Sequence, residues 1–403
     1  MTSGNDGGPV LGLGVVGLGG ASLAMIPKFA KNPGYRIAAA ADIDEEILGR
    51  FRADNPETET YAAMELLCKS PSVDLVYIAT PNRWHSEHAR IALENKKHVL
   101  IEKPMTITLD EADVMIKTAD DNGVLLGVNV KHSFEPRVLK LSQLAASKEF
   151  GALRMINSWR YADWLYRPRT GEELTPAFGG GILWRQGPHQ FDILRTIGRG
   201  MVRSVRGLAA TWDAARRVPG CHTAYLDFEE GAVATAVFSG YDHFDSRELV
   251  HGPGTVPAET HAQARAELRN APTADWEEAA ARAERYGGER QMSAEPRPTG
   301  HGGGWILGGP MVVSFDHADV QLSPAGLEVF DDERRYEIPM VEPGVDGRDG
   351  RINTYYEAIV NGKPLPADGR WGKATLELLL AIEESGAKRA EMRLSHQVPA
   401  VDV

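Results

Sequence analysis

Short apolar runs alternate with amphipathic segments from residue 9 to about residue 130. The runs LGLGVVG, RIAAAAD, VDLVYIAT, HVLIE and GVLLGV have the length and composition of strands. Between them, SEHARIALENKK and LDEADVMIKTADDNG repeat apolar residues at intervals of three and four, as helices do, and the second ends in a helix-terminating Asn-Gly. This alternation predicts a doubly wound parallel sheet with helices on both faces.

Longer runs of alternating polarity follow residue 150, among them ALRMINSWRYADW, HTAYLDFEE, AVATAVFSGYD and PMVVSFDHADVQL. Such alternation is typical of strands with one buried face, so we predict a C-terminal α+β domain with an open, mainly antiparallel sheet. The predicted domains are residues 1–135 and 136–403, with a charged helical insertion at about 258–286. A C-terminal helix over 372–386 is expected to pack back on the body.

Composition excludes several classes of protein. The 403 residues, 42% hydrophobic and 25% charged, are typical of a multidomain globular protein. A net charge of −12 argues against non-specific nucleic-acid binding. Asp6 and no Lys or Arg precede the apolar run from Pro9, and no stretch reaches the ~20 residues of a membrane helix, so we expect a cytoplasmic protein. With only Cys68 and Cys221, we predict neither disulfides nor a metal site.

The glycine cluster after the first strand fits the dinucleotide-binding fingerprint in two registers. Gly12, Gly14 and Gly17 match its letters, but only PVL would then remain as strand. The register that uses Gly17, Gly19 and then Ser22 leaves LGLGVV as strand and SLAMIPKFAKN as helix. Its glycines would let backbone N–H groups approach a pyrophosphate at a helix N-terminus.

Asp42 ends the second predicted strand, at the separation from the glycines where a carboxylate accepts from an adenosine ribose hydroxyl. No arginine follows closely to bind a 2′-phosphate, so NAD is favoured over NADP. A solvated acidic loop is the alternative interpretation. Strand, turn, helix and carboxylate together predict a Rossmann-like domain whose first cofactor contacts are Gly17, Gly19, Gly20 and Asp42.

The motifs IATPNRWHSEHA and HVLIEKPM stand at the carboxyl ends of two predicted strands, where ligands bind in open α/β sheets. Lys103 could present its ammonium to a substrate hydroxyl and a nicotinamide, or be a surface lysine. For His85 a cofactor contact and an ordinary loop position both remain open. The further predicted cofactor contacts are the polar residues of these motifs, namely Thr80, Asn82, His85 and Glu102.

The segment GGGILWRQGPHQFD places Arg185 and His189 four residues apart, on the same side of a helix. Pro188 is tolerated if it lies in the first turn of that helix, where no N–H is needed. Asp192 would orient the imidazole or lie at the helix surface.

GLGG, AAAD, the stretch from YIATPN to KHVLIEKP, and GGGILWRQGPHQFD together resemble the Gfo/Idh/MocA family, which includes glucose-fructose oxidoreductase and inositol dehydrogenase. The similarity covers nearly the whole chain, including YYEAIVNGKPLPADGRWGKATLELLLAIEESGAKR. It implies a nicotinamide-binding domain and an open sheet whose face closes over the cofactor and often mediates oligomerisation, so we expect a homodimer or homotetramer. It also implies that Lys103 is the active-site lysine and His189 the catalytic histidine.

Two residues depart from the family pattern: Arg185 replaces a common aspartate, and Ser133 replaces a frequent arginine, with an effect that we cannot assign. A guanidinium offers a planar fork to a substrate carboxylate, although a salt bridge with a neighbouring acid is the alternative. RYADWLYRPRTGEELTP adds Arg160, Arg167 and Arg169 among aromatic residues. Arginines and rings together suit a flat, ring-shaped dianion.

The RPR and RQGPHQ motifs resemble the phthalate cis-4,5-dihydrodiol dehydrogenase branch of the family. That resemblance implies an NAD-dependent dehydrogenase taking a hydride from a ring CH–OH of an anionic cis-dihydrodiol. Lys103 and His189 would share the hydroxyl proton, and the substrate contacts would be Arg185, Arg167, Arg169 and Trp184. A sugar or cyclitol dehydrogenase of the same fold, and a non-catalytic protein that keeps the cofactor fold, are the alternatives.

Overall fold

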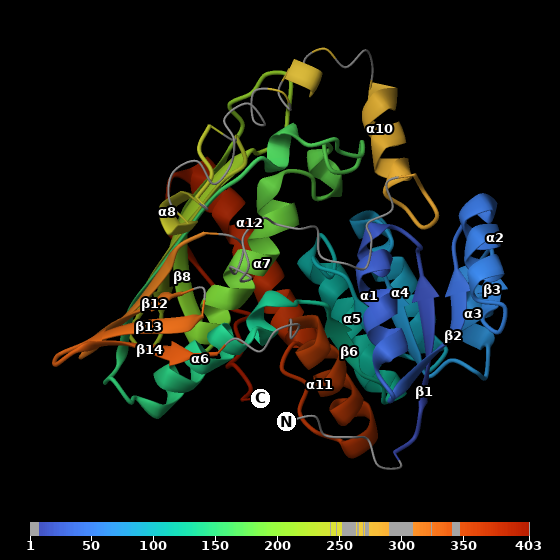
Figure 1. The fold of residues 1–403 in the computed structure, drawn as a ribbon, viewed down its shortest axis with the longest axis horizontal. Coiled ribbons are helices and arrows are strands. Elements are labelled where there is room, and N and C mark those ends of the chain that lie inside the picture. The colour runs from blue at the N-terminus through green and yellow to red at the C-terminus, as the bar shows by residue number, and fades with distance from the viewer. Residues whose placement is uncertain are drawn as a thin grey trace. The chain divides into compact units, whose positions relative to one another are not determined.

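The computed structural model describes residues 8–241, 243–246, 248–251, 263, 266–268, 270, 274–289, 309–323, 325–340 and 347–402. These residues form two compact units (Figure 1). Unit 1 contains the described residues of 1–129, 279–297 and 348–373, and unit 2 contains those of 130–278, 298–347 and 374–403. Each unit is built around one sheet.

The sheet of unit 1 has six strands in the order β3-β2-β1-β4-β5-β6, and all of its strand pairs are parallel. The strands are β1 (Leu11–Val16), β2 (Tyr35–Ala41), β3 (Glu59–Tyr61), β4 (Leu75–Ile78), β5 (His98–Ile101) and β6 (Leu126–Val128). The predicted doubly wound sheet is confirmed, although the short strand β3 was not predicted. The strand order reverses between β1 and β4, which is where ligands bind in folds of this kind.

The helices of unit 1 complete the alternation with the strands. They are α1 (Gly20–Lys31), α2 (Glu45–Asp54), α3 (Met64–Lys69), η1 (Asn82–Trp84), α4 (His85–Glu94), α5 (Leu109–Asn122) and, from its second residue, α11 (Gly347–Asn361). As predicted, α5 ends at a left-handed Gly123. The strands β1 and β4 are buried throughout, so both faces of the sheet are covered.

Residues 348–373 belong to unit 1, although they lie far along the chain. The reason is a set of buried polar contacts from α11 to the strand carbonyls. Arg351, which is fully buried, donates from Nη2 to the Val128 carbonyl oxygen at 2.7 Å. The Tyr355 hydroxyl donates to the carbonyl oxygens of Val99 and Leu125. No pattern in the sequence indicated these contacts.

Unit 2 has a nine-stranded sheet in the order β14-β13-β12-β11-β7-β10-β9-β8-β15. The strands are β7 (Leu153–Tyr161), β8 (Val202–Ala210), β9 (Cys221–Phe228), β10 (Val233–Ser239), β11 (Met311–Phe315), β12 (Ala318–Leu322), β13 (Gly326–Asp331), β14 (Arg335–Pro339) and β15 (Met392–Arg393). Among the strand pairs that the described residues form in this sheet, only β7 and β10 are parallel, so the mainly antiparallel sheet is confirmed. In Figure 1, β12, β13 and β14 form the orange end of this sheet.

Helices alternate with groups of strands along the chain of unit 2. They are η2 (His132–Phe134), α6 (Pro136–Ser147), η3 (Trp164–Tyr166), η4 (Pro176–Phe178), α7 (Ile182–Ile197), α8 (Glu248–His251), α10 (Ala274–Ala283) up to Glu278, and α12 (Gly369–Lys388) from Ala374 on. The predicted C-terminal helix corresponds to α12. It packs on α7, where a Cβ on Gly187 would lie 3.0 Å from Leu379, and on β8, where one on Gly207 would lie 3.1 Å from Ile382.

Within the charged insertion predicted at 258–286, α10 is the longest described element, and much of the remainder lies outside the described residues. Among the helices that the structure describes, none has an apolar stretch long enough to cross a membrane.

Candidate active site

The structure separates the glycines of the first cluster into two kinds. Gly12 and Gly14 lie inside β1, where a Cβ on Gly12 would come 1.8 Å from the Ser72 carbonyl oxygen. Gly17 follows the strand with a φ of +88°, a conformation that other residues rarely adopt. A Cβ on Gly17 would also lie 2.9 Å from the Ala79 carbonyl oxygen. The turn therefore begins at Gly17, in the strand, turn and helix context of the second register.

Gly19 and Gly20 leave space at the start of the helix that follows. A Cβ on either residue would meet no heavy atom of the described chain within 4 Å. Gly19 is the N-cap of α1 and makes no side-chain cap hydrogen bond. The Ser22 hydroxyl closes the turn by donating to the Gly17 carbonyl oxygen. Open space beside two glycines at a helix N-terminus fits the pyrophosphate of a dinucleotide.

Asp42, at the end of β2, is attached to this turn. Its Oδ2 accepts from the Leu18 backbone N–H at 2.7 Å, and its Oδ1 accepts from the Asp44 backbone N–H at 2.9 Å. Asp44 in turn caps α2 by accepting from two backbone N–H groups. Asp42 is therefore held in place rather than solvated in a loose loop. Each of its oxygens keeps a lone pair for a ribose hydroxyl.

His85 connects the turn after β4 to the segment after β5. The side chain is 1% exposed, with Nδ1 2.8 Å from the Pro104 carbonyl oxygen and Nε2 2.8 Å from the Thr80 carbonyl oxygen. Because carbonyl oxygens only accept, the imidazole uses both contacts fully when both of its nitrogens carry hydrogen. Beside it, Thr80 Oγ1 lies 2.9 Å from His88 Nδ1, and Asn82 is buried at the start of η1. His85 thus braces the backbone, and its predicted cofactor contact stays a prediction.

Lys103 follows β5 between two residues whose positions are fixed. On one side, Glu102 Oε1 accepts from the Tyr77 hydroxyl and from Asn129 Nδ2, each at 2.6 Å. Burial, together with the Glu102 carboxylate, holds the pKa of Tyr77 well above its ordinary value, so the phenol keeps its proton for this bond. On the other side, the carbonyl of Pro104 is held by His85. The half-buried Lys103 is therefore carried on a rigid segment at the carboxyl edge of the sheet.

Arg185 and His189 lie on α7 in unit 2, both half-buried and one helical turn apart, as predicted. The prediction for Pro188 is wrong. The helix begins at Ile182, after a Gly181 with φ +89°, so Pro188 lies inside it and not in its first turn. The missing N–H of Pro188 leaves the carbonyl four residues earlier, that of Trp184, without its usual helical donor.

Gln190 anchors α7 to the sheet and was not predicted. Its Nε2 donates to Ser158 Oγ at 2.9 Å, and its Oε1 lies 2.9 Å from Nε2 of the buried His222. Burial lowers the pKa of His222 to about 3, so its ring is neutral and Nε2 carries the hydrogen for this bond. A buried amide with partners on both sides fixes the rotation of α7 and hence the direction of its neighbour, His189.

A second histidine lies against His189. The rings of His132 and His189 are perpendicular, with their centroids 4.9 Å apart, and His132 Nδ1 is 3.0 Å from Glu135 Oε1. His132 was not predicted as a site residue, although its spacing of three from an acid is visible in HSFEP.

The arginine segment, residues 160–185, carries its own carboxylates. Arg167 is exposed and forms a two-pronged pair with Asp163. Arg169 has a side chain only 13% exposed, donates to the Trp164 carbonyl oxygen and pairs with Glu173 at 3.2 Å. The first turns of α10 also contact this segment, because Glu277 accepts a hydrogen bond from the Arg169 backbone N–H at 2.9 Å. The predicted clamp roles of Arg167 and Arg169 stay predictions, with each guanidinium already engaged by protein acids.

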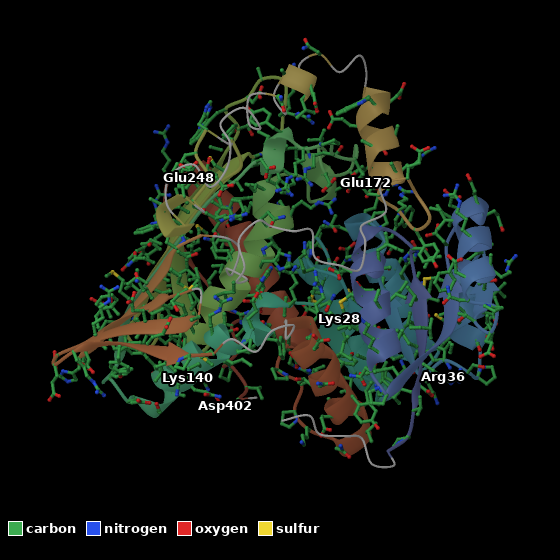
Figure 2. All side chains as sticks on the ribbon, in the orientation of Figure 1. Lys28, Arg36, Lys140, Glu172, Glu248 and Asp402 are labelled. Carbon is green, nitrogen blue, oxygen red and sulfur yellow. The ribbon has the colours of Figure 1, made fainter. Side chains whose placement is uncertain are left out.

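Arg185 lies among the same acids. Burial, partly offset by the Glu173 and Glu172 carboxylates, lowers the pKa of its guanidinium (Glu172 is labelled in Figure 2). For Glu173, burial acts to raise the pKa, but Arg169 and Arg185 outweigh it, so the pKa lies below the usual 4.5. The Glu173 and Glu172 carboxylates thus support the alternative that Arg185 forms a salt bridge with neighbouring acids. Trp184 is 5% exposed and donates to Glu383 at 2.8 Å, which leaves little indole surface for a substrate.

Unit 1 thus brings together the predicted cofactor residues, and unit 2 brings together Arg185, His189 and the arginine segment. Comparison with known proteins assigns the N-terminal and the C-terminal parts of the chain to the same family. The model of the Gfo/Idh/MocA oxidoreductase family with an NAD-binding Rossmann fold matches residues 11–130. The model of the C-terminal domain of that family matches residues 138–254.

Individual relatives agree. A 1-carboxy-3-chloro-3,4-dihydroxycyclohexa-1,5-diene dehydrogenase from Comamonas testosteroni is 33% identical over 386 residues, which are 93% of this chain and 94% of that protein. A scyllo-inositol 2-dehydrogenase (NADP(+)) from Bacillus subtilis is 31% identical over 143 residues, 35% of this chain and 39% of that protein. A solved structure from Bordetella bronchiseptica RB50 has a TM-score of 0.85 and 34% identity, covering 96% of this chain and all of that one. This chain therefore belongs to the Gfo/Idh/MocA family of oxidoreductases, with an NAD-binding Rossmann domain in its N-terminal part.

Proposed function

We propose that this protein is an NAD-dependent dehydrogenase that oxidises a ring CH–OH of a carboxylated cyclic cis-dihydrodiol, such as phthalate 4,5-cis-dihydrodiol. The observation that carries the proposal is Arg185, a half-buried cation on the same face of α7 as His189. The name of the Comamonas relative describes a substrate of the same kind, a cyclohexadiene with a carboxyl group and two adjacent hydroxyls. A carboxylate and a ring diol are what a guanidinium and a proton acceptor side by side would recognise.

The cofactor would be held by unit 1. Gly17, Gly19 and Gly20 would receive its pyrophosphate, Asp42 its adenosine ribose, and the polar residues after β4 and β5 its remaining groups, namely Thr80, Asn82, His85 and Glu102. When bound, NAD supplies the acceptor for the hydride. The acidic Asp42 favours NAD over NADP.

Lys103 and His189 would share the removal of the hydroxyl proton. As the substrate C–H bond gives up its hydrogen with both electrons, the hydroxyl loses its proton to one of these two groups. The product is a ring ketone, and in a cis-dihydrodiol this ketone enolises to an aromatic diol, which drives the reaction. The rigid mounting of Lys103 between Glu102 and Pro104 supports its part, because proton transfer requires a fixed geometry.

Arg185 would orient the ring by binding its carboxylate. Glu173 and Glu172 interact electrostatically with the Arg185 guanidinium, so a substrate carboxylate must compete with these acids for it. Arg169 also pairs with Glu173 and so reduces that competition. We therefore assign the main anion contact to Arg185 and only a supporting part to Arg169 and Arg167.

A cyclitol or sugar dehydrogenase is the second candidate. The Bacillus relative acts, by its name, on scyllo-inositol, and carboxylates near Arg185 are suited to binding polyol hydroxyls. In this case Arg185 would be a salt-bridge partner and not an anion site.

We also propose a homo-oligomer. Strands β7 and β9 of the nine-stranded sheet expose large apolar side chains, namely Met155, Trp159, Tyr161 and Tyr225. Exposed apolar side chains that gather on one sheet are typical of an interface between subunits.

The two candidates are separated by following NADH formation with four substrates: phthalate 4,5-cis-dihydrodiol, a monocarboxylated cis-dihydrodiol, an uncharged cis-dihydrodiol and scyllo-inositol. We expect the carboxylated compounds to react with a kcat/KM at least a hundredfold higher. In Arg185→Gln that advantage should fall to within about tenfold, because a charge-assisted bidentate contact is lost. Arg203→Gln changes an exposed arginine of β8 that pairs with Asp227 and has no part in the proposed anion site, so it is the control and should keep that advantage. Faster turnover of scyllo-inositol in the parent enzyme would select the second candidate.

A further inference from the structure

His132 and Glu135 form a pair next to the residue that the proposed function makes a proton acceptor. Both side chains are largely buried, at 14% and 17% exposure, and His132 Nδ1 lies 3.0 Å from Glu135 Oε1. A carboxylate only accepts, so this contact requires hydrogen on Nδ1 and sets both the tautomer and the plane of the His132 ring. Glu135 itself is 3.6 Å from Arg137 Nη2, which further restricts it.

The fixed His132 ring is perpendicular to the ring of His189, with centroids 4.9 Å apart and an interplanar angle of 89°. Edge-to-face contact of this kind restricts rotation of both rings. Gln190 already fixes α7 itself through Ser158 and His222. The backbone and the ring plane of His189 are thus held from two different sides within unit 2.

We propose that His132, anchored by Glu135, is a positioning residue for His189 and keeps that ring neutral and ready to accept a proton. The proposal rests on the proposed function, which gives His189 the hydroxyl proton. The second effect is electrostatic, because two imidazoles in contact resist carrying positive charge at the same time. His132 is bonded to the Glu135 carboxylate, which stabilises a proton on His132, and a charged His132 disfavours a proton on His189.

The elements that carry the two rings also carry other charged groups. Lys131 and Glu135 flank η2, Arg137 lies in the first turn of α6, and α7 carries Arg185 and Asp192 besides His189. Exchanging only the His132 ring removes its bond to Glu135 and leaves the other side chains in this set unchanged, so the effect of the His132–Glu135 pair can be isolated by one substitution.

The test is His132→Phe, which keeps an aromatic ring against His189 but removes its charge and its bond to Glu135. We expect kcat to fall about tenfold with KM within twofold, because a misoriented proton acceptor slows the chemical step more than binding. The acid limb of the pH profile of kcat/KM should move upward by about half a pH unit or more, since His189 would protonate more easily. His317→Phe is the matched control, because His317 forms an exposed pair with Asp332 at 3.1 Å.

Glu135→Ala is the second variant, for use if His132→Phe does not fold, because it keeps the His132 ring and removes its anchor. A fall of at least threefold in its kcat supports the proposal. A third measurement needs no substrate: the NMR titration of the His189 ring should shift upward in His132→Phe. Unchanged kcat, pH profile and NMR titration would overturn the role of His132.

His189→Asn separates this inference from the proposed function. If it abolishes turnover while His132→Phe behaves as the parent, only the role of His132 is wrong. If His189→Asn itself stays within a few-fold of the parent, the proton-accepting role of His189 fails, and with it the basis of the inference.

Discussion

The candidate functional residues of unit 1 and those of unit 2 are built differently. The glycine turn of unit 1 is formed almost entirely by backbone, with a positive φ at Gly17 and open space beside Gly19 and Gly20. The arginine segment of unit 2 is formed by long charged side chains that are paired with acids, as in Arg169 with Glu173. Backbone geometry can recognise a cofactor that is common to a whole family, whereas side-chain charges can be exchanged to change the substrate.

The glycine turn and the arginine segment are sensitive to different kinds of substitution. A backbone turn fails through sterics, when a side chain fills its space or forbids its φ. A charged segment fails through electrostatics, when one partner of a buried pair is removed and the other is left in a poorly solvated place. Substitutions of Lys103, of Arg169, of the glycines at 17 and 19, and of His222 test these differences.

Lys103→Ala should give the largest effect, a loss of kcat of about 10²- to 10⁴-fold, because a proton-transfer group is removed. NAD should still bind with a Kd within about threefold of the parent, since the turn that receives it is built without side chains. Stopped-flow kinetics and calorimetric titration measure the two quantities. Lys117→Ala, an exposed lysine paired with Asp121, is the control. A parent-like kcat in Lys103→Ala would remove Lys103 from the mechanism.

Arg169→Ala should destabilise the protein by about 3 kcal/mol, because it removes the ion-pair partner of the largely buried Glu173 and leaves that carboxylate only partly compensated. The neighbouring Arg167→Ala should cost less than about 1 kcal/mol, since its pair with Asp163 is exposed on the arginine side. Urea unfolding followed by circular dichroism measures both changes. Equal losses would show that burial does not separate the two arginines.

Gly17→Ala should lower the stability of the protein, whereas Gly19→Val should weaken the binding of NAD. Alanine at position 17 must adopt a φ of +88° with its Cβ near the Ala79 carbonyl, which should cost about 1–3 kcal/mol of stability. Valine at position 19 has an ordinary φ of −82° and room around it, so stability should change by less than about 0.5 kcal/mol. The NAD Kd should nevertheless rise at least about tenfold for Gly19→Val. Unimpaired NAD binding there would contradict the pyrophosphate site.

His222 should make stability depend on pH. Burial lowers its folded pKa to about 3, while the unfolded chain titrates near 6.5, so between these values only the unfolded state gains the proton. Stability is therefore complete above about pH 6.5 and falls with acidification by up to about 1.4 kcal/mol per pH unit from this group. In His222→Gln the part of the pH dependence of stability that comes from His222 should disappear. Identical pH dependence of urea midpoints in the two proteins would mean that His222 is not held neutral.

Much of unit 1 could be predicted because its signals are local. The runs RIAAAAD and HVLIE identify buried strands, and the Gly17 turn is identified by the strand before it and the helix after it. The position of Pro188 within α7 was predicted wrongly, because proline is typical of a first helical turn although it lies inside this helix. Tertiary packing of α7 against α12 and the sheet compensates for the bond that proline removes.

The partners of the site residues could not be predicted. Nothing local indicates that Gln190 bonds to His222, that Tyr355 bonds to the carbonyl of Val99, or that His132 contacts His189. These contacts join residues far apart in the chain, and many other pairs of the same types would be chemically equivalent.

The sequence by itself determined the parallel and antiparallel sheets, the position of the glycine turn, and the kinds of groups available for chemistry, because periodicity and backbone preference act over a few residues. Only the tertiary structure decided which arginines are neutralised by acids, which histidines are buried, and which ring lies against His189. Charge pairing and burial depend on distances between elements, and those distances are set when the chain packs.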